Sequence, residues 1–342
     1  MYSFKNDYSE GAHRSILEAF LETNMIQEIG YGEDSFTEKA KELIKEKLQN
    51  KEASIHLLSG GTQTNLIAIS AFLRPHEAVI SANTGHILVH ETGAIEATGH
   101  KIISVPSKDG KLVSEDIVNV LESHTDEHMV RPKLVYISNS TEIGTVYTKE
   151  ELENLYNCCR ENRLILFVDG ARLGSALCAD GNDLSLEYMG KFSDAFYIGG
   201  TKNGALFGEA LVIINESLKE DFRFHIKQKG GLLAKGRALG LQFFKLFEND
   251  LYFDLAKHAN QMSKILSDGI RELGYKFLID SNSNQVFPIL PNEIIKKLEK
   301  NYAFYIWEKF DEENSVIRLV TSWATPKEEV EAFVEELKKI SK

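Results

Sequence analysis

Seven short apolar segments that recur between helical stretches constrain the fold of this chain more than any other feature. They are SIHLL at 54–58, AVIS at 78–81, KIISV at 101–105, KLVYIS at 133–138, LILFVD at 164–169, AFYIGG at 195–200 and ALVIIN at 210–215. Strands this apolar are typically buried on both faces, and their alternation with helices favours a mostly parallel sheet covered on both sides. The sequence therefore predicts an α/β fold with a seven-stranded sheet.

Helical spacing occurs before and between these segments. Residues 36–48 place apolar side chains on one helical face and charged side chains on the other. Residues 65–73 and 149–162 also show helical spacing. After about residue 225 a glycine-rich stretch leads into helical sequence through roughly 273, then short strand-like pieces and a final helix at 326–340. We predict a large domain over 1–230, including the N-terminal segment, and a smaller α+β domain over 231–342.

Charge and the absence of targeting patterns limit the function classes. Asp and Glu number 51 against 39 Lys and Arg, a net charge of −12, so a polyanion would be repelled and nucleic acid is not expected as a partner. Neither a signal peptide nor a long apolar span is visible, so we expect a cytoplasmic protein without a membrane partner. Three cysteines, Cys158, Cys159 and Cys178, lack CxxC spacing and are expected to be reduced core residues.

Ligands of such a sheet bind beyond the carboxyl ends of its strands. LILFVD is followed by GARLGSA, which places Asp169 at a strand end and Arg172 three residues later. A carboxylate there can bind a protonated ring nitrogen, and a guanidinium can bind a carboxylate through two hydrogen bonds. An Asp in this position can also simply cap a turn, so the functional interpretation needs further support.

That support comes from the end of the next strand segment, where AFYIGG continues into Thr201, Lys202, Asn203 and Gly204. A lysine at a strand end, flanked by glycines that let a ligand approach the backbone, can form an imine with an aldehyde cofactor once its pKa is lowered. A lone lysine after two glycines would usually be a solvated turn residue. Together with Asp169 and Arg172, it predicts a cofactor site.

Two further segments fit that site. After SIHLL, the stretch from Ser59 to Asn65 contains Gly60, Gly61 and Thr62 before a helix, so its amides can bind a phosphate, although a plain strand-to-helix turn would look similar. In NTGHILVHETGA, His86 can lie against a planar cofactor. His86, His90 and Glu91 could instead form a metal site, which leaves a metal-dependent hydrolase as an alternative.

With these elements in this order, the chain resembles the threonine aldolase and aromatic amino acid β-eliminating lyase family of fold-type I pyridoxal-phosphate enzymes. The resemblance covers almost the whole chain and rests on YGED at 31–34, GGTQTN at 60–65, GHILVHETGA at 85–94, DGARLGSA at 169–176, TKNGALFG at 201–208 and IRLVTSW at 317–323. It implies an aspartate-aminotransferase-like large domain and pyridoxal 5'-phosphate as cofactor. It implies that Lys202 holds the cofactor as a Schiff base and that Asp169 binds the ring nitrogen. His86 would lie on the ring, and Thr201 beside the lysine. Gly61 and Thr62 would bind the phosphate.

The same resemblance implies the substrate side of the site. Arg172 and Arg318 would bind the substrate carboxylate, and His128 in HMVRP weakly matches a family histidine near the substrate hydroxyl. The family's Arg-Ser-Asp-Thr reads Lys5-Asn6-Asp7-Tyr8 here, so Asn6 replaces a serine that binds the carboxylate, and the Glu-Asn-Thr-His stretch reads Ser138 to Thr141. The cofactor residues are retained, whereas the substrate residues differ.

The resemblance implies cleavage of L-threonine or L-allo-threonine to glycine and an aldehyde, with His128, His86 or a water as the base and no metal. Because the same cofactor supports other reactions, β-elimination and transamination on a small amino acid remain alternatives. A non-catalytic binding protein on the same fold is a third class, against which the intact Lys202 argues. The resemblance also implies a homodimer or homotetramer in which Tyr31 and the basic stretch 227–237 complete a neighbour's site.

Overall fold

The large sheet of the protein organises everything else in the fold. The computed structural model describes residues 1–342. Along the sheet the strands lie in the order β2 (Ser54–Leu58), β8 (Glu209–Ile213), β7 (Ala195–Gly199), β6 (Ile165–Asp169), β5 (Arg131–Ser138), β3 (Glu77–Ala82) and β4 (Ile102–Val105). Only β8 pairs antiparallel with both of its neighbours. The predicted seven-stranded, mostly parallel sheet is confirmed.

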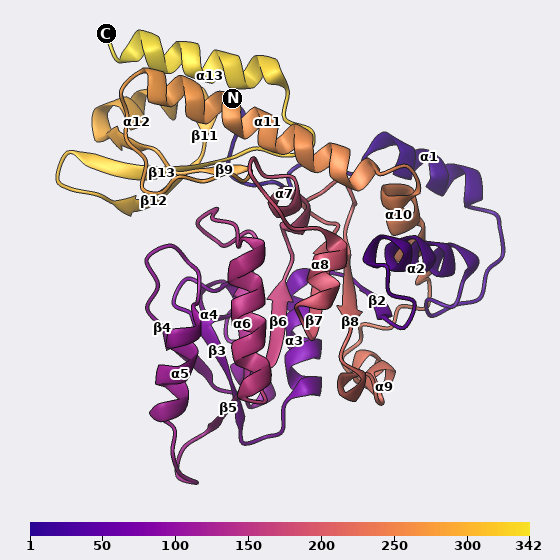
Figure 1. Ribbon diagram of the computed structural model, residues 1–342. Helices are drawn as coiled ribbons and strands as arrows, with labels where there is room; N and C mark the ends of the chain where they lie inside the picture. Colours follow the sequence, from indigo (N-terminus) through magenta and orange to yellow (C-terminus); the bar gives the residue numbers. More distant parts are fainter.

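The two faces of this sheet pack against different sets of helices. Ala195 and Tyr197 of β7 belong to the core beneath α3 (Gly61–Phe72) and α9 (Phe222–Gln228). Phe196 and Ile198 point into the opposite core. That core is formed by α2 (Ser35–Leu48), α5 (Ser114–Glu122), α6 (Lys149–Glu161), α8 (Leu186–Lys191) and α10 (Arg237–Glu248). Helices lie on both sides of the sheet (Figure 1). Alternate residues of one strand thus serve two apolar layers, which explains the continuous apolar segments in the sequence.

Local hydrogen bonds begin the helices where the sequence changes from turn to helical spacing. Thr148 accepts a hydrogen bond from the amide of Glu151 at 3.2 Å, and the Glu151 carboxylate accepts one from the amide of Thr148 at 2.8 Å. This reciprocal capping box fixes the start of α6. Asp34 caps α2 through the amide of Thr37 at 2.9 Å.

The smaller domain combines a helical layer with short strands. It contains α11 (Leu251–Glu272), β9 (Gln285–Val286), β10 (Ile289–Pro291), α12 (Asn292–Leu298), β11 (Tyr302–Ala303), β12 (Tyr305–Lys309), β13 (Asn314–Val320) and α13 (Lys327–Ile340). Strand β13 pairs antiparallel with β9, β10 and β12. The N-terminal strand β1 (Tyr2–Ser3) pairs with β11, so the start of the chain lies in the smaller domain (Figure 1).

The apolar cores divide the chain differently from the predicted boundary at 230/231. Phe243 and Leu255 pack into the core of the large sheet, although they follow residue 230. Phe4 packs with Leu266 and Phe333 in the core of the smaller domain, although it was assigned to the large one. The division of the apolar cores therefore falls within α11, and the N-terminal strand belongs to the smaller domain because β1 pairs with β11.

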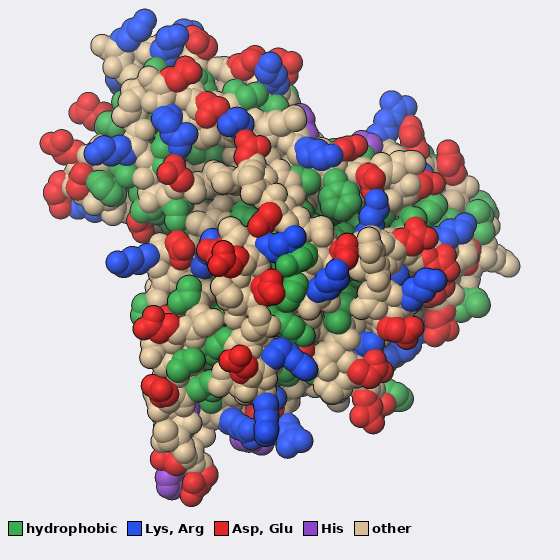
Figure 2. Space-filling view, viewed as in Figure 1, with side chains coloured by type: hydrophobic (Ala, Val, Ile, Leu, Met, Phe, Trp, Pro, Cys, Tyr) green, Lys and Arg blue, Asp and Glu red, His purple; other side chains and the backbone are tan.

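The remaining elements are short helices and 3-10 turns. They are α1 (Arg14–Thr23), α4 (His86–Val89), α7 (Leu173–Leu177) and the 3-10 turns Glu96–Thr98 and Glu216–Leu218. All three cysteines have free thiols, but Cys178 is only partly buried, unlike Cys158 and Cys159 in the core. None of the helices combines the length and apolar character needed to cross a membrane. Acidic and basic side chains are interspersed over the face seen in Figure 2.

Two glycines let the carboxyl ends of β6 and β7 approach each other backbone to backbone. A Cβ atom at Gly170 would lie 1.7 Å from the carbonyl oxygen of Tyr197, and one at Gly199 would lie 2.4 Å from that of Ala171. The amide of Gly199 donates to the carbonyl of Gly170 at 2.9 Å. This close approach sets the positions of the residues that follow each strand.

We expect Gly170→Ala to lower the free energy of unfolding by about 3 kcal/mol or more, because the added methyl group meets backbone that has no room to move. Urea unfolding followed by circular dichroism measures the change. Gly11→Ala is the matched control, since its Cβ would have only Leu206 at 4.0 Å as a neighbour. Equal stability of the two variants would contradict the proposed role of Gly170.

Candidate active site

A cavity of about 410 Å³ lies at the carboxyl edge of the large sheet, between the two domains. Its lower wall comes from the large domain and consists of His86, His90, Glu142, Arg172 and Lys202. Its upper wall comes from the N-terminal segment and the β12 and β13 strands, and consists of Tyr8, Tyr305, Ile306, Trp307 and Arg318. The cavity therefore brings together four of the side chains predicted from the sequence, Lys202, His86, Arg172 and Arg318.

Lys202 follows β7 and presents an amine without a hydrogen bond or an ion pair. Burial lowers its pKa, the nearby Arg172 cation lowers it further, and the carboxylates of Asp7 and Asp169 oppose these effects only in part. A lowered pKa raises the fraction of neutral amine, which is the nucleophilic form. The lysine predicted from the sequence therefore lies in the cavity, with a lowered pKa and no bonded partner.

Thr201, beside this lysine, is held by strand β8. Its hydroxyl donates to Glu209 at 2.9 Å and accepts from the amide of Gly208 at 2.9 Å. Glu209 also accepts from the amide of Gly200 at 3.0 Å, and burial raises its pKa to about 8. These contacts fix the turn that carries Lys202, and they leave the Thr201 hydroxyl directed at Glu209.

Asp169 ends β6 and is fully enclosed by donors. One carboxylate oxygen accepts from the amide of Ala171 at 3.0 Å and from the hydroxyl of Tyr197, and the other from Asn65 at 3.1 Å and from the hydroxyl of Tyr136. Burial alone would raise the pKa of Asp169, but the charge of His86 and these hydrogen bonds hold it below its ordinary value. Asp169 is therefore a buried, permanently ionised group.

His86 begins α4 and is connected to Asp169 through two buried side chains. Its Nδ1 lies 2.8 Å from Glu91 Oε1, which also accepts from Asn65 at 2.8 Å, and Asn65 in turn donates to Asp169. His90 is exposed, with its ring centroid 5.5 Å from that of His86. No three His, Cys, Asp or Glu side chains are grouped to hold a metal ion, so the hydrolase alternative has no support.

The start of α3 forms a cradle for an anion. A helix leaves its first amide N–H groups without internal partners, and α3 begins at Gly61 with Gly60 before it. A Cβ at Gly60 would have no neighbour within 4 Å, so space is open in front of this turn. Thr62 is exposed beside it. A Cβ at Gly61 would lie 3.1 Å from the Tyr197 hydroxyl that holds Asp169, so the cradle adjoins the buried carboxylate.

Arg172 forms a bidentate ion pair with Asp7, which was not among the site residues predicted from the sequence. Its Nε donates to Asp7 Oδ2 at 2.7 Å and its Nη2 to Oδ1 at 3.1 Å. Asn284 also donates to Asp7, at 2.9 Å. Burial by itself would raise the pKa of Asp7, but the Arg172 and Lys202 cations lower it, so the carboxylate stays ionised. The only sequence signal was the likeness of Lys5-Asn6-Asp7-Tyr8 to a family motif.

Arg318 reaches the same cavity from β13. Its guanidinium carbon lies 5.1 Å from the ring centroid of Trp307 and 5.4 Å from that of Tyr305, and its buried Nε has no hydrogen-bond partner. Burial and the neighbouring Arg172 lower its pKa. Of the two guanidinium groups, only that of Arg172 is paired with a protein carboxylate, which leaves donors of Arg318 free for the carboxylate of a ligand.

Two residues predicted for the substrate side do not line the cavity. Asn6 turns its Oδ1 toward its own loop, where it accepts from the amide of Tyr8 at 3.0 Å and the hydroxyl of Ser9 at 2.9 Å. His128 is exposed in the loop before β5, at the amino edge of the sheet and opposite the cavity. The prediction for His128 therefore disagrees with this structure. The short motif on which it rested gave no information about the direction of the strand that follows it.

Glu142 is a titratable cavity residue that was not predicted from the sequence. Its Oε1 accepts from the hydroxyl of Ser138 at 2.6 Å and from the amide of His86 at 2.9 Å. Burial raises its pKa, the Ser138 hydrogen bond opposes this, and the Asp169 charge raises it further. The altered stretch noted at residues 138–141 ends one residue before it, so the signal lay next to the site without identifying the residue.

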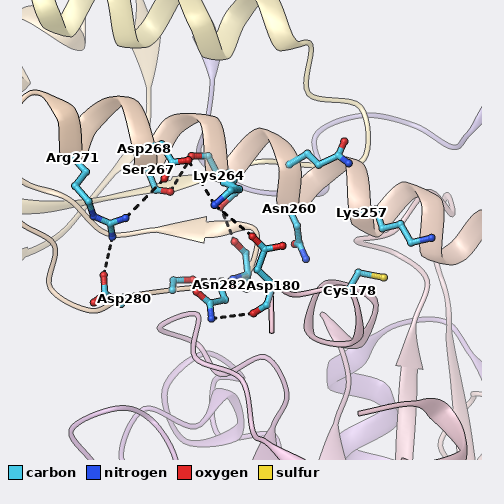
Figure 3. A pocket seen from close by; sticks show the side chains of 14 residues that line it. Cys178, Asp180, Lys257, Asn260, Lys264, Ser267, Asp268, Arg271, Asp280 and Asn282 are labelled. Carbon is cyan, nitrogen blue, oxygen red and sulfur yellow. Dashed lines mark hydrogen bonds and ion pairs between the residues drawn. The ribbon is translucent and has the colours of Figure 1, made fainter. Parts of the chain in front are cut away.

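Another hollow, of about 490 Å³, lies along α11, but its charges are already paired (Figure 3). Arg271 pairs with Asp280 at 2.9 Å, and Lys264 reaches Asp180 at 3.5 Å across the hollow. Such exposed pairs contribute little to stability and leave no charge to recruit a ligand. The cavity around Lys202 is therefore the candidate active site.

Comparison with known proteins agrees on one family. A family model described as β-eliminating lyase matches residues 7–292. Low specificity L-threonine aldolase of Pseudomonas aeruginosa is 30% identical over 98% of this chain and 96% of its own length. The structure of Leishmania major threonine aldolase is 51% identical, with a TM-score of 0.99 and full coverage of both chains. Aspartate aminotransferase of Thermus thermophilus is 16% identical, and the match covers 99% of this chain and 91% of that one with a TM-score of 0.72. This likeness shows the fold alone.

We expect Asp7→Asn to lower the free energy of unfolding by about 3 kcal/mol at pH 7, because it leaves the buried Arg172 charge without its counter-ion. The lowered pKa of Asp7 means that its contribution is present above its unfolded pKa of about 3.9 and lost as the pH falls below that value. The difference between wild type and variant should therefore shrink in acid.

Urea unfolding at several pH values measures both effects. Glu33→Gln is the matched control because it breaks the exposed pair with Arg223 at 2.9 Å, where solvent already screens the charges. If Asp7→Asn were no less stable than Glu33→Gln at pH 7, the buried pair would not have the structural role assigned to it.

Proposed function

Because the chain belongs to the β-eliminating lyase family, we propose that it is a pyridoxal-phosphate-dependent lyase that cleaves L-threonine or L-allo-threonine to glycine and acetaldehyde. The observation that carries the proposal is the unpaired Lys202 amine with a lowered pKa in a cavity that also contains two arginines. The relatives named as low specificity L-threonine aldolases support the substrate and the bond that is cleaved.

The residues around the cavity have the chemistry that this cofactor needs. The amides at the start of α3, with open space at Gly60, suit its phosphate, and the ionised Asp169 suits its protonated ring nitrogen. Lys202 would hold it covalently through Nζ, and His86 would lie against its ring. When bound, pyridoxal phosphate withdraws electrons from the substrate's α-carbon, so that a bond at this atom can break heterolytically.

The arginines define how the substrate would be oriented. Arg172, held by Asp7, and Arg318, with its unpartnered Nε, would bind the α-carboxylate. Tyr305 and Trp307 cover this end of the cavity from the smaller domain and reduce its contact with water. A carboxylate held here would keep the rest of a small amino acid inside the cavity that His86 and Glu142 also line.

Other reactions on the same cofactor would use the same residues, so an assay must separate them. Transamination leaves an amino group on the cofactor, and β-elimination releases water or another leaving group with the Cα–Cβ bond intact. Cleavage of threonine is distinguished by equal amounts of glycine and acetaldehyde. We propose cleavage because the relatives that match almost the whole chain carry that name.

We expect the pyridoxal-phosphate-loaded protein to release acetaldehyde and glycine from L-threonine or L-allo-threonine, and Lys202→Ala to reduce this release to background. The variant lacks the amine that holds the cofactor and should also lose the visible absorbance of the covalently held cofactor. Lys257→Ala, an exposed lysine on α11, is the matched control and should retain both signals.

Coupled measurement of aldehyde, glycine and absorbance tests the proposal. Normal aldehyde release by Lys202→Ala would overturn the assignment of the lysine. Cofactor absorbance without aldehyde in the wild type would retain the cofactor and reject threonine cleavage.

We also propose that the protein forms a homodimer or homotetramer in which Tyr31 and the 227–237 stretch face a partner's site. Tyr31, Phe224 and Leu232 line an open hollow of about 380 Å³ on the surface. Further apolar side chains are exposed nearby in sequence, at Leu21, Met25, Ile26 and Ile29. Clustered exposed apolar residues of this kind favour a protein interface.

We expect Phe224→Asp to shift the protein toward smaller species in sedimentation velocity at micromolar concentration, because it places a charge in an apolar contact. Phe224 is 75% exposed in the single chain, so the change should not unfold it. Phe310→Asp, at an exposed position following β12, is the control. A wild type that sediments as a 38.5 kDa monomer would contradict the proposed assembly.

A further inference from the structure

We propose that Glu142 is the catalytic residue that removes the proton from the substrate's β-hydroxyl group. The inference rests on the proposed function and adds the identity of the base, for which the sequence offered only histidines or a water. Glu142 lines the same cavity as Lys202, the two carboxylate-binding arginines, His86 and His90. A substrate anchored at Arg172 and Arg318 would therefore lie in the space that Glu142 also borders.

The hydrogen bonds of Glu142 hold one oxygen and leave the other available. The hydroxyl of Ser138 and the backbone amide of His86 both donate to Oε1, at 2.6 and 2.9 Å. Oε2 has no hydrogen-bond partner in the protein, and it is not among the enclosed unpartnered atoms. The carboxyl group is thus held in a fixed orientation, with a free acceptor that a substrate hydroxyl can satisfy.

The two neighbouring histidines are less suited to this role. The Nδ1 of His86 is already engaged with Glu91, and its ring is expected to lie against the cofactor. His90 is exposed and makes no hydrogen bond that would orient its ring. Only Glu142 combines a fixed orientation, burial and a free acceptor.

The charge environment of Glu142 favours proton uptake. Burial raises its pKa, as does the charge of Asp169, whereas the Ser138 hydrogen bond and His86 lower it. Arg172, Tyr136 and Tyr147 are further titratable groups near enough for their pKa values to respond to the Glu142 charge. A carboxyl group with a raised pKa is a stronger base than an ordinary glutamate, which favours removal of a proton from a substrate hydroxyl.

The step balances without another reactant. The β-hydroxyl proton moves to Glu142 Oε2, and the electron pair of the O–H bond forms the carbonyl double bond of the aldehyde. The Cα–Cβ bond breaks and leaves its electron pair on Cα, where one proton is added to complete glycine. The net result is transfer of one proton from oxygen to carbon, with no oxidation or reduction.

Glu142→Gln tests the inference because it retains the size and the Oε1 acceptor but cannot take a proton. We expect kcat for aldehyde release from L-threonine to fall about 100-fold or more. Glycine has no β-hydroxyl group, so exchange of its α-protons in heavy water should stay within about threefold of wild type. Glu142→Asp, which keeps a carboxylate, should recover part of the lost cleavage, and Glu150→Gln, an exposed neighbour, should behave as wild type.

Two binding measurements provide readouts that do not depend on turnover. Titration of the cofactor-free variant with pyridoxal phosphate should give the wild-type dissociation constant. Glycine binding, followed by the fluorescence of Trp307 in the cavity wall, should also be unchanged. The acidic limb of the wild-type profile of kcat/KM against pH should be absent from the residual activity of Glu142→Gln, which a purely structural role would not produce.

The outcomes separate the two proposals. Near-normal threonine cleavage by Glu142→Gln, with an active wild type, would overturn the role of Glu142 alone. Joint loss of cleavage, glycine exchange and cofactor binding would also overturn it, because the residue would then be structural. Absence of aldehyde from the wild type would reject the proposed function and with it this step.

Discussion

The bidentate ion pair between Asp7 and Arg172 is the interaction on which the arrangement of the cavity depends. Asp7 belongs to the N-terminal segment, whose first strand pairs with the smaller domain, whereas Arg172 follows β6 of the large sheet. Asn284, at the entry to β9, donates to the same carboxylate. Three distant segments therefore meet at one buried charge pair. Breaking a buried pair is costly, so the two walls of the cavity are held in a fixed relation to each other.

Two buried carboxyl groups in this region have opposite pKa shifts, and their hydrogen bonds explain the difference. Asp169 receives four donors spread over both oxygens, which favours the charged form despite burial. Glu142 receives two donors, both on Oε1, so burial dominates and favours the protonated form. Asp169 is therefore suited to pairing with a cation, and Glu142 to exchanging a proton. Residue type alone could not have distinguished them.

The sequence predicted the parts of the site that follow from strand direction. Asp169 and Lys202 could be found because an apolar segment ending in a polar residue marks the carboxyl end of a parallel strand, where ligands bind. Asp7 could not, because its partner lies 165 positions away and no local pattern connects them. Glu142 lies in an irregular segment after β5, whose path depends on tertiary packing. His128 was assigned from a short likeness, and the strand it precedes carries it to the opposite edge.

The fold alone does not select the reaction, because an aspartate aminotransferase shares it at 16% identity. A β-hydroxy amino acid differs from other small amino acids by a hydroxyl group on Cβ. Selection for cleavage must therefore come from the side chains that lie near Cβ. In this protein the cavity offers Glu142 and the two histidines for that role, whereas the arginines suit the carboxylate. A single oriented acceptor can recognise a hydroxyl group without fixing the size of what lies beyond it. Such an acceptor would select the bond that breaks more strictly than the side chain.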